Sequence, residues 1–159
     1  MLERRKPFIG RDRLPADIKG AYDQAVDVFN ARVWTGSTTL CGRTLEAIVE
    51  DLGRRHKLNT DKKQRAPKRI REILAAHLDA DDSLTRLADS IRLGRNIGAH
   101  FDPDHTPDEC VATRMLDLVE YLLEYVYSLP AMIDGAREAL DSLEQADSTA
   151  ESDGDSGAG

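Results

Sequence analysis

Residues 106–126 read TPDECVATRMLDLVEYLLEYV and carry the clearest helical signal of the chain. Thr106 is a favoured N-cap residue, Pro107 suits the first helical position, and Glu109 stands three residues after the cap, which makes a capping box. Apolar residues then recur at helical spacing and cover more than one face. They are Val111, Met115, Leu116, Leu118, Val119, Leu122, Leu123 and Val126. We therefore predict a central helix here, packed by several neighbours or by a second subunit.

Helical spacing continues on both sides of this segment, and no stretch alternates convincingly with period two. Further helices are predicted to begin after Pro15, near residues 35–37, at Pro67, near Asp82 and after Pro130, where the chain bends or restarts. The fold class is therefore all-α, a single bundle of about five to six helices over residues 1–146. Residues 147–159 are rich in Asp, Ser, Gly and Ala and are predicted to form a disordered acidic tail.

The composition is that of a soluble globular domain, with 159 residues, 40% of them apolar and 32% charged. Apolar runs are too short for a membrane span or a secretory signal, so we expect a cytoplasmic protein with no membrane partner. Two cysteines, Cys41 and Cys110, are too few for a disulfide framework or a four-thiolate zinc site. Both are expected to be reduced thiols in the core.

The net charge of −7 is unevenly distributed along the chain. Residues 101–159 hold 15 acidic and 2 basic residues, whereas residues 54–71 hold nine basic residues and one acidic residue. The basic segment 54–71 is a candidate surface for nucleic-acid phosphates, although a solvated basic loop explains such a run equally simply. Its candidate phosphate contacts are Arg54, Arg55, Lys57, Lys62, Lys63, Arg65, Lys68 and Arg69.

Residues 91–100, with the sequence IRLGRNIGAH, carry the residue types that suit a chemical site. With Arg92 at 0° on an ideal helix, Asn96 and His100 lie near 40° and 80°, roughly opposite the apolar stripe. Gly94 falls on the apolar side, as does Gly98, so a neighbouring helix can approach closely. Arg95 flanks that stripe, near 300°.

A histidine, an arginine and an amide without a carboxylate suit metal-independent phosphodiester cleavage. The imidazole transfers protons near neutral pH, the guanidinium binds phosphate, and the amide orients either group. The alternative is that Asn96 and His100 only cap the end of the helix. No cofactor motif is present, and the His and Asp residues at 100–105 are a weak candidate for a metal. Arg43 and Glu46, three residues apart, are expected to pair.

Four blocks of the chain resemble one branch of the HEPN superfamily (higher eukaryote and prokaryote nucleotide-binding domains), the domain of unknown function DUF 4145. The blocks are PADIKGAYDQA at 15–25, LCGRTLEAI at 40–48, IRLGRNIGAH at 91–100 and YSLP at 127–130. Within the third block, Arg95, Asn96 and His100 match the superfamily signature of arginine, polar residue and histidine.

The resemblance implies an all-helical bundle, commonly a homodimer, with the motif near the subunit interface. Many members are metal-independent ribonucleases of toxin–antitoxin, phage-defence or RNA-processing systems, and others are inactive binding modules. In a ribonuclease, His100 would transfer protons, Arg95 would engage the RNA phosphate, and Asn96 would position them, with Arg92 as an alternative phosphate contact. A defence-system or antitoxin protein is then an expected partner.

Two functions therefore remain open, an endoribonuclease and a non-catalytic dimerisation or nucleic-acid-binding accessory module. The enzyme requires an exposed His100 in a groove that also holds a guanidinium. The module predicts a His100 that is hydrogen-bonded inward, or an Arg95 that is locked in an ion pair.

Overall fold

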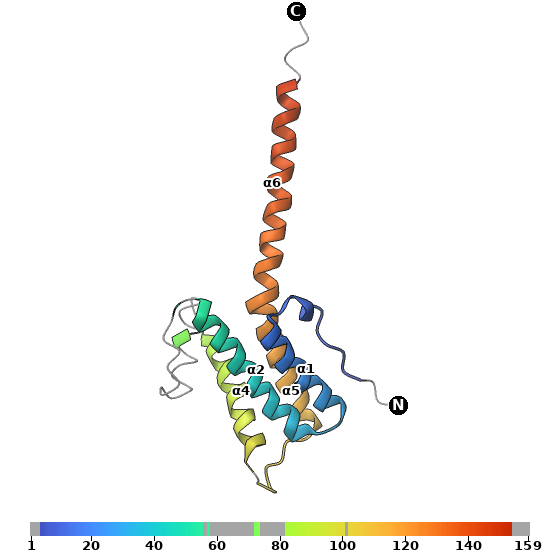
Figure 1. Ribbon diagram of the computed structural model, residues 1–159, viewed down its shortest axis with the longest axis vertical. Coiled ribbons are helices and arrows are strands. Elements are labelled where there is room, and N and C mark those ends of the chain that lie inside the picture. The colour runs from blue at the N-terminus through green and yellow to red at the C-terminus, as the bar shows by residue number, and fades with distance from the viewer. Residues whose placement is uncertain (1–3, 56, 58–71, 74–81, 101, 154–159) are drawn as a thin grey trace, which may run out of the picture.

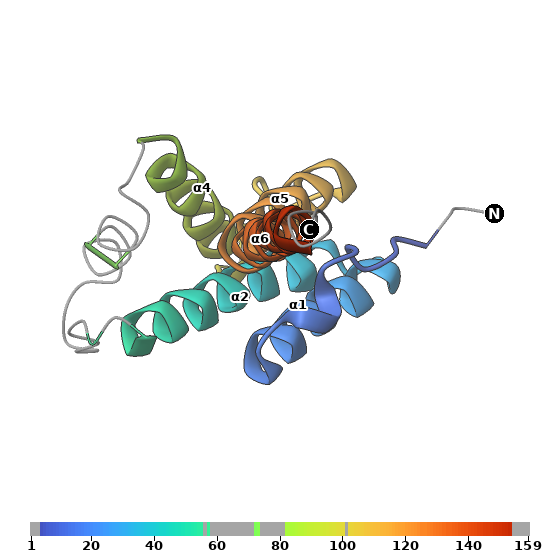
Figure 2. The same cartoon turned by 90° about the horizontal axis from the view of Figure 1, so that it is seen from above.

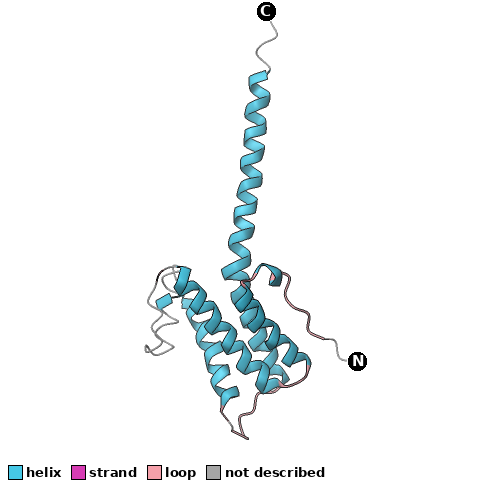
Figure 3. Ribbon diagram, viewed as in Figure 1, coloured by secondary structure: helices cyan, strands magenta, loops and turns pink. Residues whose placement is uncertain are grey.

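The computed structural model describes residues 4–55, 57, 72–73, 82–100 and 102–153. Its helices are α1 (Ala16–Asn30), α2 (Trp34–Arg55), α4 (Asp82–Ala99), α5 (Glu109–Leu123) and α6 (Leu129–Asp153), with a short 3-10 turn η1 (Arg11–Arg13) and a π turn η2 (Glu124–Ser128). No strand occurs in these described ranges, as Figure 3 shows, so the predicted all-α class is confirmed. The helix predicted to begin at Pro67 lies outside the described residues, apart from a helical fragment at 72–73.

The bundle is built around α2, which lies against α1, α4 and α5 (Figures 1 and 2). Tyr22 of α1, Ile48 of α2, Ile91 of α4 and Leu116 of α5 are fully buried at its centre. The apolar faces predicted for these helices therefore form one core, which stabilises each helix by tertiary packing. Leaving the bundle, α6 projects away from it as a long single helix (Figure 1).

The N-terminal segment is attached to the bundle by hydrogen bonds that begin at Arg5. Its guanidinium donates to both oxygens of Glu120 at 3.1 and 2.7 Å and to Asp117 at 2.7 Å. The Tyr22 phenol donates to Glu120 at 2.7 Å and accepts the backbone N–H of Phe8 at 3.1 Å. Burial is the main reason that the pKa of Tyr22 is raised, and the bond to Glu120 adds to it.

The structure corrects the predicted start of α5. Its N-cap is Asp108, whose carboxylate accepts the backbone N–H of Val111 at 2.9 Å. The Thr106 hydroxyl instead donates to the Asp102 carbonyl at 3.2 Å, within the preceding turn. Thr and Asp are both good caps, and the turn at 102–106 decides which of them stands at the helix end.

The chain from α5 to α6 remains helical through Pro130 and does not restart there. Proline lacks an N–H, and in an α-helix its ring collides with the carbonyl four residues earlier, here that of Val126. The π turn at 124–128 is wider at this point, which accommodates the proline without ending the helix. The helix also runs on to Asp153, past the end predicted near Ala146, so residues 147–153 of the predicted tail are helical.

The two cysteines have different environments. Cys41 is buried in the core as predicted, and burial raises the pKa of its thiol to about 12. Cys110 is exposed in the first turn of α5, so its predicted place in the core is wrong. Within the described part of the chain, no helix combines the length and the apolar character needed to cross a membrane.

Candidate functional site

Two glycines of α4 bring its final turns close to the neighbouring helices. A Cβ at Gly98 would stand 3.0 Å from the Thr35 carbonyl oxygen and 2.8 Å from the Thr39 hydroxyl, both in α2. Gly94 is buried against the thioether of Met115 in α5. The close approach predicted from these glycines is confirmed, and it fixes the positions of the residues between and after them.

Arg95 turns toward α2 and forms a salt bridge with Glu46. Its aliphatic carbons pack over Gly42, where a Cβ would overlap with them. The side chains of Arg95 and Glu46 are 35% and 39% exposed, so the ion pair lies at the edge of the contact between α2 and α4. The sequence predicted that Glu46 pairs with Arg43 of its own helix. In the structure Glu46 pairs with Arg95, because α4 packs against α2 here and places the Arg95 guanidinium beside the Glu46 carboxylate.

Arg92 and Asn96 lie on the more exposed part of α4, away from the buried Ile91 and Gly94 of its apolar stripe. The Arg92 side chain is 30% exposed, and its Nε lies 3.8 Å from the Asp89 carboxylate, one turn earlier. That Nε is buried and has no hydrogen-bond partner among the described residues. Asn96 is exposed. The guanidinium of Arg92 is therefore held less tightly than that of Arg95.

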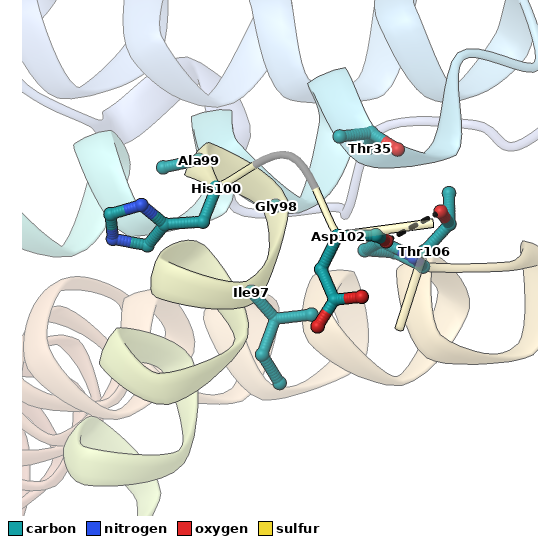
Figure 4. A pocket seen from close by; sticks show the side chains of 8 residues that line it. Thr35, Ile97, Gly98, Ala99, His100, Asp102 and Thr106 are labelled. Carbon is teal, nitrogen blue, oxygen red and sulfur yellow. Dashed lines mark hydrogen bonds between the residues drawn. The ribbon is translucent and has the colours of Figure 1, made fainter. Parts of the chain in front are cut away.

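His100 follows the last residue of α4 and is exposed to solvent. Its backbone N–H donates to the Asn96 carbonyl at 3.3 Å, which continues the helical turn. A shallow hollow of about 420 Å³ lies beside it (Figure 4). The hollow is lined by Thr35, Ile97, Gly98, Ala99, His100, Asp102, Thr106 and Pro107. None of these carries a guanidinium, and Figure 4 shows the imidazole pointing away from Asp102 and Thr106.

The sequence of the chain matches a protein family over most of its length. The family model described as domain of unknown function (DUF4145) matches residues 23–145, a range that includes α2, α4, α5 and most of α6. This chain belongs to the DUF4145 family. No curated protein and no solved structure matches it.

In this DUF4145 domain, the turn after His100 uses its polar groups internally. Asp102 accepts the backbone N–H of Asp104 at 3.0 Å through one oxygen, and its other oxygen lies 2.8 Å from Nδ1 of His105. Within the described ranges, no three His, Cys, Asp or Glu side chains gather as a metal site would require. The polar residues of this turn therefore shape the loop that joins α4 to α5.

The basic segment is described only at its beginning. Arg55 pairs with the buried Asp51 at 2.8 Å and lies over the Tyr127 ring, 5.3 Å from its centroid. Arg54 is 4.0 Å from the same carboxylate, and Lys57 is exposed in a left-handed backbone conformation. The remaining candidate phosphate contacts lie outside the described residues; they are Lys62, Lys63, Arg65, Lys68 and Arg69.

Two features of the domain escaped sequence reasoning. The first is the network in which the Tyr127 phenol donates to Asp51 at 2.8 Å, with the pKa of Tyr127 raised by burial and by that bond. No local pattern joins residues so far apart in the chain. The second is the exposed apolar stripe of α6. Its signal was present in the spacing of Leu129, Met132, Leu140 and Leu143.

Proposed function

We propose that this DUF4145 domain is a non-catalytic dimerisation module. The observation that carries the proposal is the state of Arg95, which is ion-paired with Glu46 and turned toward α2. Metal-independent RNA cleavage requires an imidazole and a cation that reach the same phosphate. On a straight helix, Arg95 and His100 project about 140° apart. Among the described residues that line the hollow beside His100, there is no lysine or arginine to replace Arg95.

The finer identity that we propose is an accessory member of the HEPN superfamily, acting in the cytoplasm within a prokaryotic defence or restriction system. Support comes from the Arg95, Asn96 and His100 signature at the end of α4, and from the resemblance of the surrounding blocks. In an accessory member, the arginine of this signature joins α4 to α2, and the protein acts by assembling with a partner.

A second function, a metal-independent endoribonuclease, is favoured by a different observation. His100 is exposed, and Arg92 lies on the same side of α4 with a buried Nε that lacks a hydrogen-bond partner in the described part of the chain. An enzyme of this kind would use Arg92, or an arginine of a second subunit, to bind the RNA phosphate.

An RNA-cleavage assay in EDTA separates the two functions. The full chain, its His100→Ala variant and its His105→Ala variant are incubated with mixed RNAs, and the product ends are identified. His105 is a suitable control because it is an exposed histidine in the adjoining turn, 76% exposed, outside the signature. We expect no cleavage by any of the three proteins.

One result would contradict the proposed non-catalytic function. The wild type and the His105→Ala variant would both produce RNA fragments with 2′,3′-cyclic phosphate ends, while a folded His100→Ala variant would not. The single tryptophan, Trp34, reports folding, because its ring packs against Phe29 at 5.1 Å between centroids.

A further inference from the structure

The helix α6 extends beyond the bundle with little to cover it (Figures 1 and 2). It runs from Leu129 to Asp153, about 37 Å at 1.5 Å per residue. Every residue from 129 to 146 is exposed. Helices in proteins owe most of their stability to the packing of an apolar face. Residues 129–146 of this helix have no such packing against the described part of the chain.

The exposed surface of α6 is divided into an apolar and a charged side. With Leu129 at 0°, its apolar residues fall between about 260° and 40° on an ideal helix. This apolar stripe consists of Leu129, Met132, Ile133, Ala136, Ala139, Leu140, Leu143 and Ala146. The charged residues lie between about 60° and 180°. These are Asp134, Arg137, Glu138, Asp141 and Glu144.

The apolar stripe has the spacing of a helix–helix seam. Six of its members recur at alternating intervals of three and four residues, the pattern of a and d positions in a coiled coil. They are Leu129, Met132, Ala136, Ala139, Leu143 and Ala146, with Ile133 and Leu140 beside them. Its largest side chains are widely exposed, with Met132 at 59%, Leu140 at 60% and Leu143 at 65%. Solvent exposure of so many aligned apolar side chains indicates a surface that another helix covers.

We infer that α6 pairs in antiparallel orientation with α6 of a second copy of this chain. The inference rests on the proposed dimerisation function and names its surface. Self-pairing is electrostatically allowed because the predominantly acidic side of α6 points away from the seam in both copies. The remaining flank carries the small uncharged residues Ala131, Gly135 and Ser142.

The antiparallel orientation follows from the order of large and small residues. When the two helices cross midway between Arg137 and Glu138, Leu129 faces Ala146 of the other copy, Met132 faces Leu143, and Ala136 faces Ala139. Ile133 and Leu140 lie beside this seam. The large side chain of Leu129 therefore meets a small one, and the two alanines allow close approach where the helices cross. A parallel pair would place leucine on leucine and alanine on alanine, so that the spacing of the helices would vary along the seam.

The base of α6 offers a second contact for the partner helix. A cavity of about 640 Å³ adjoins the stripe at Met132 and is lined by Phe8, Ile9, Gly10, Arg13, Glu124, Ser128 and Met132. Ile9 is fully exposed there, and the buried Oγ of Ser128 has no hydrogen-bond partner among the described residues.

The antiparallel register brings the end of the partner helix to this base. Arg13 and Glu124 line the cavity there. Arg5 and Arg11 of the same segment are paired with acidic residues of the bundle, Asp117 and Asp23.

The first test measures the mass of the purified full chain by sedimentation or light scattering, with a Leu140→Glu, Leu143→Glu double variant. We expect a dimer for the wild type and the chain mass of 17.7 kDa for the variant. A matched control, Glu138→Gln with Asp141→Asn, changes the charged side and is expected to remain dimeric. Both variants should keep the Trp34 fluorescence of the folded bundle, since α6 lies outside the core.

The inference is overturned if the wild type is monomeric at a protein concentration about 100-fold above a typical micromolar Kd. It is also overturned if the double variant remains dimeric. A monomeric wild type would also contradict the proposed dimerisation function, whereas a double variant that remains dimeric would overturn only the pairing through α6. The cleavage assay separately decides whether His100 is catalytic.

The second test determines the orientation by disulfide trapping in a Cys110→Ser background. A Leu129→Cys chain and a differently tagged Ala146→Cys chain are mixed and oxidised. The antiparallel pair predicts disulfides between the two kinds of chain. Disulfides between two Leu129→Cys chains would instead show a parallel pair and overturn the orientation.

Discussion

At the scale of the residue, glycine decides how closely α4 approaches α2. A Cβ at Gly98 meets the α2 backbone, whereas a Cβ at Gly20 in α1 meets nothing within 4 Å. The same substitution therefore has opposite consequences at the two positions. Sequence periodicity placed Gly98 on the packed side of its helix, but only the packed structure shows that its neighbour is a carbonyl oxygen that cannot move aside.

We predict that Gly98→Ala lowers the free energy of unfolding by about 1–3 kcal/mol, because the new methyl group overpacks the contact between α4 and α2. Gly20→Ala serves as the matched control and is expected to raise it by up to about 1 kcal/mol, because alanine is the better helix former. Urea unfolding followed by Trp34 fluorescence measures both. Equal effects at the two sites would contradict this packing.

Thiol reactivity distinguishes the two cysteines. A thiol reagent at pH 8 is expected to label Cys110 rapidly in the native protein and to spare Cys41 until the chain is unfolded. Cys41 is buried, and its raised pKa of about 12 keeps the thiol protonated. Mass spectrometry counts the labels, and Cys110→Ser should abolish native labelling. Rapid native labelling of that variant would contradict the burial of Cys41.

At the scale of the element, the turn that precedes α5 decides where the helix begins, and the local sequence motif does not. The capping-box pattern pointed to Thr106, yet Asp108 accepts the backbone N–H of Val111. The presence of the helix and the faces that it buries were predictable, because its apolar residues recur clearly at helical spacing. The cap residue was not, because two suitable caps stand two residues apart and the loop chooses between them.

Asp108→Ala is expected to lower the free energy of unfolding by about 1 kcal/mol through the loss of this cap. Thr106→Ala, the matched control from the preceding turn, is expected to change it by less than about 0.5 kcal/mol. Thermal unfolding followed by circular dichroism compares the two variants. A larger loss at Thr106 would restore the capping box and contradict the observed helix start.

At the scale of the whole molecule, Tyr22 joins three distant segments through one phenol, which bonds Glu120 of α5 and Phe8 of the N-terminal segment. Tyr22→Phe removes both bonds and is expected to lower the free energy of unfolding by about 1–2 kcal/mol. Tyr121→Phe, at an exposed tyrosine of the same bundle, is the control with little effect. Denaturant unfolding measures the difference.

The raised pKa of Tyr22 also predicts an alkaline loss of stability. The unfolded phenol ionises near pH 10, whereas the folded phenol keeps its proton. The stabilisation is therefore complete below about pH 10 and declines as the pH rises further, because the unfolded state then binds fewer protons. Unfolding measured from pH 8 to 11 should show a smaller decline for Tyr22→Phe than for the wild type.

The sequence by itself determined the all-α class, the apolar faces of the helices and the solvent-facing position of Asn96 and His100. These depend on the residue period of a helix, which is local. Only the tertiary structure decided that Glu46 forms a salt bridge with Arg95 and that Asp51 accepts a hydrogen bond from Tyr127. It also decided that α6 leaves the bundle with its apolar stripe exposed. Such contacts join residues that are distant in the chain. Helix periodicity predicts which side of a helix a residue faces, but it does not predict which residue of another helix it will contact.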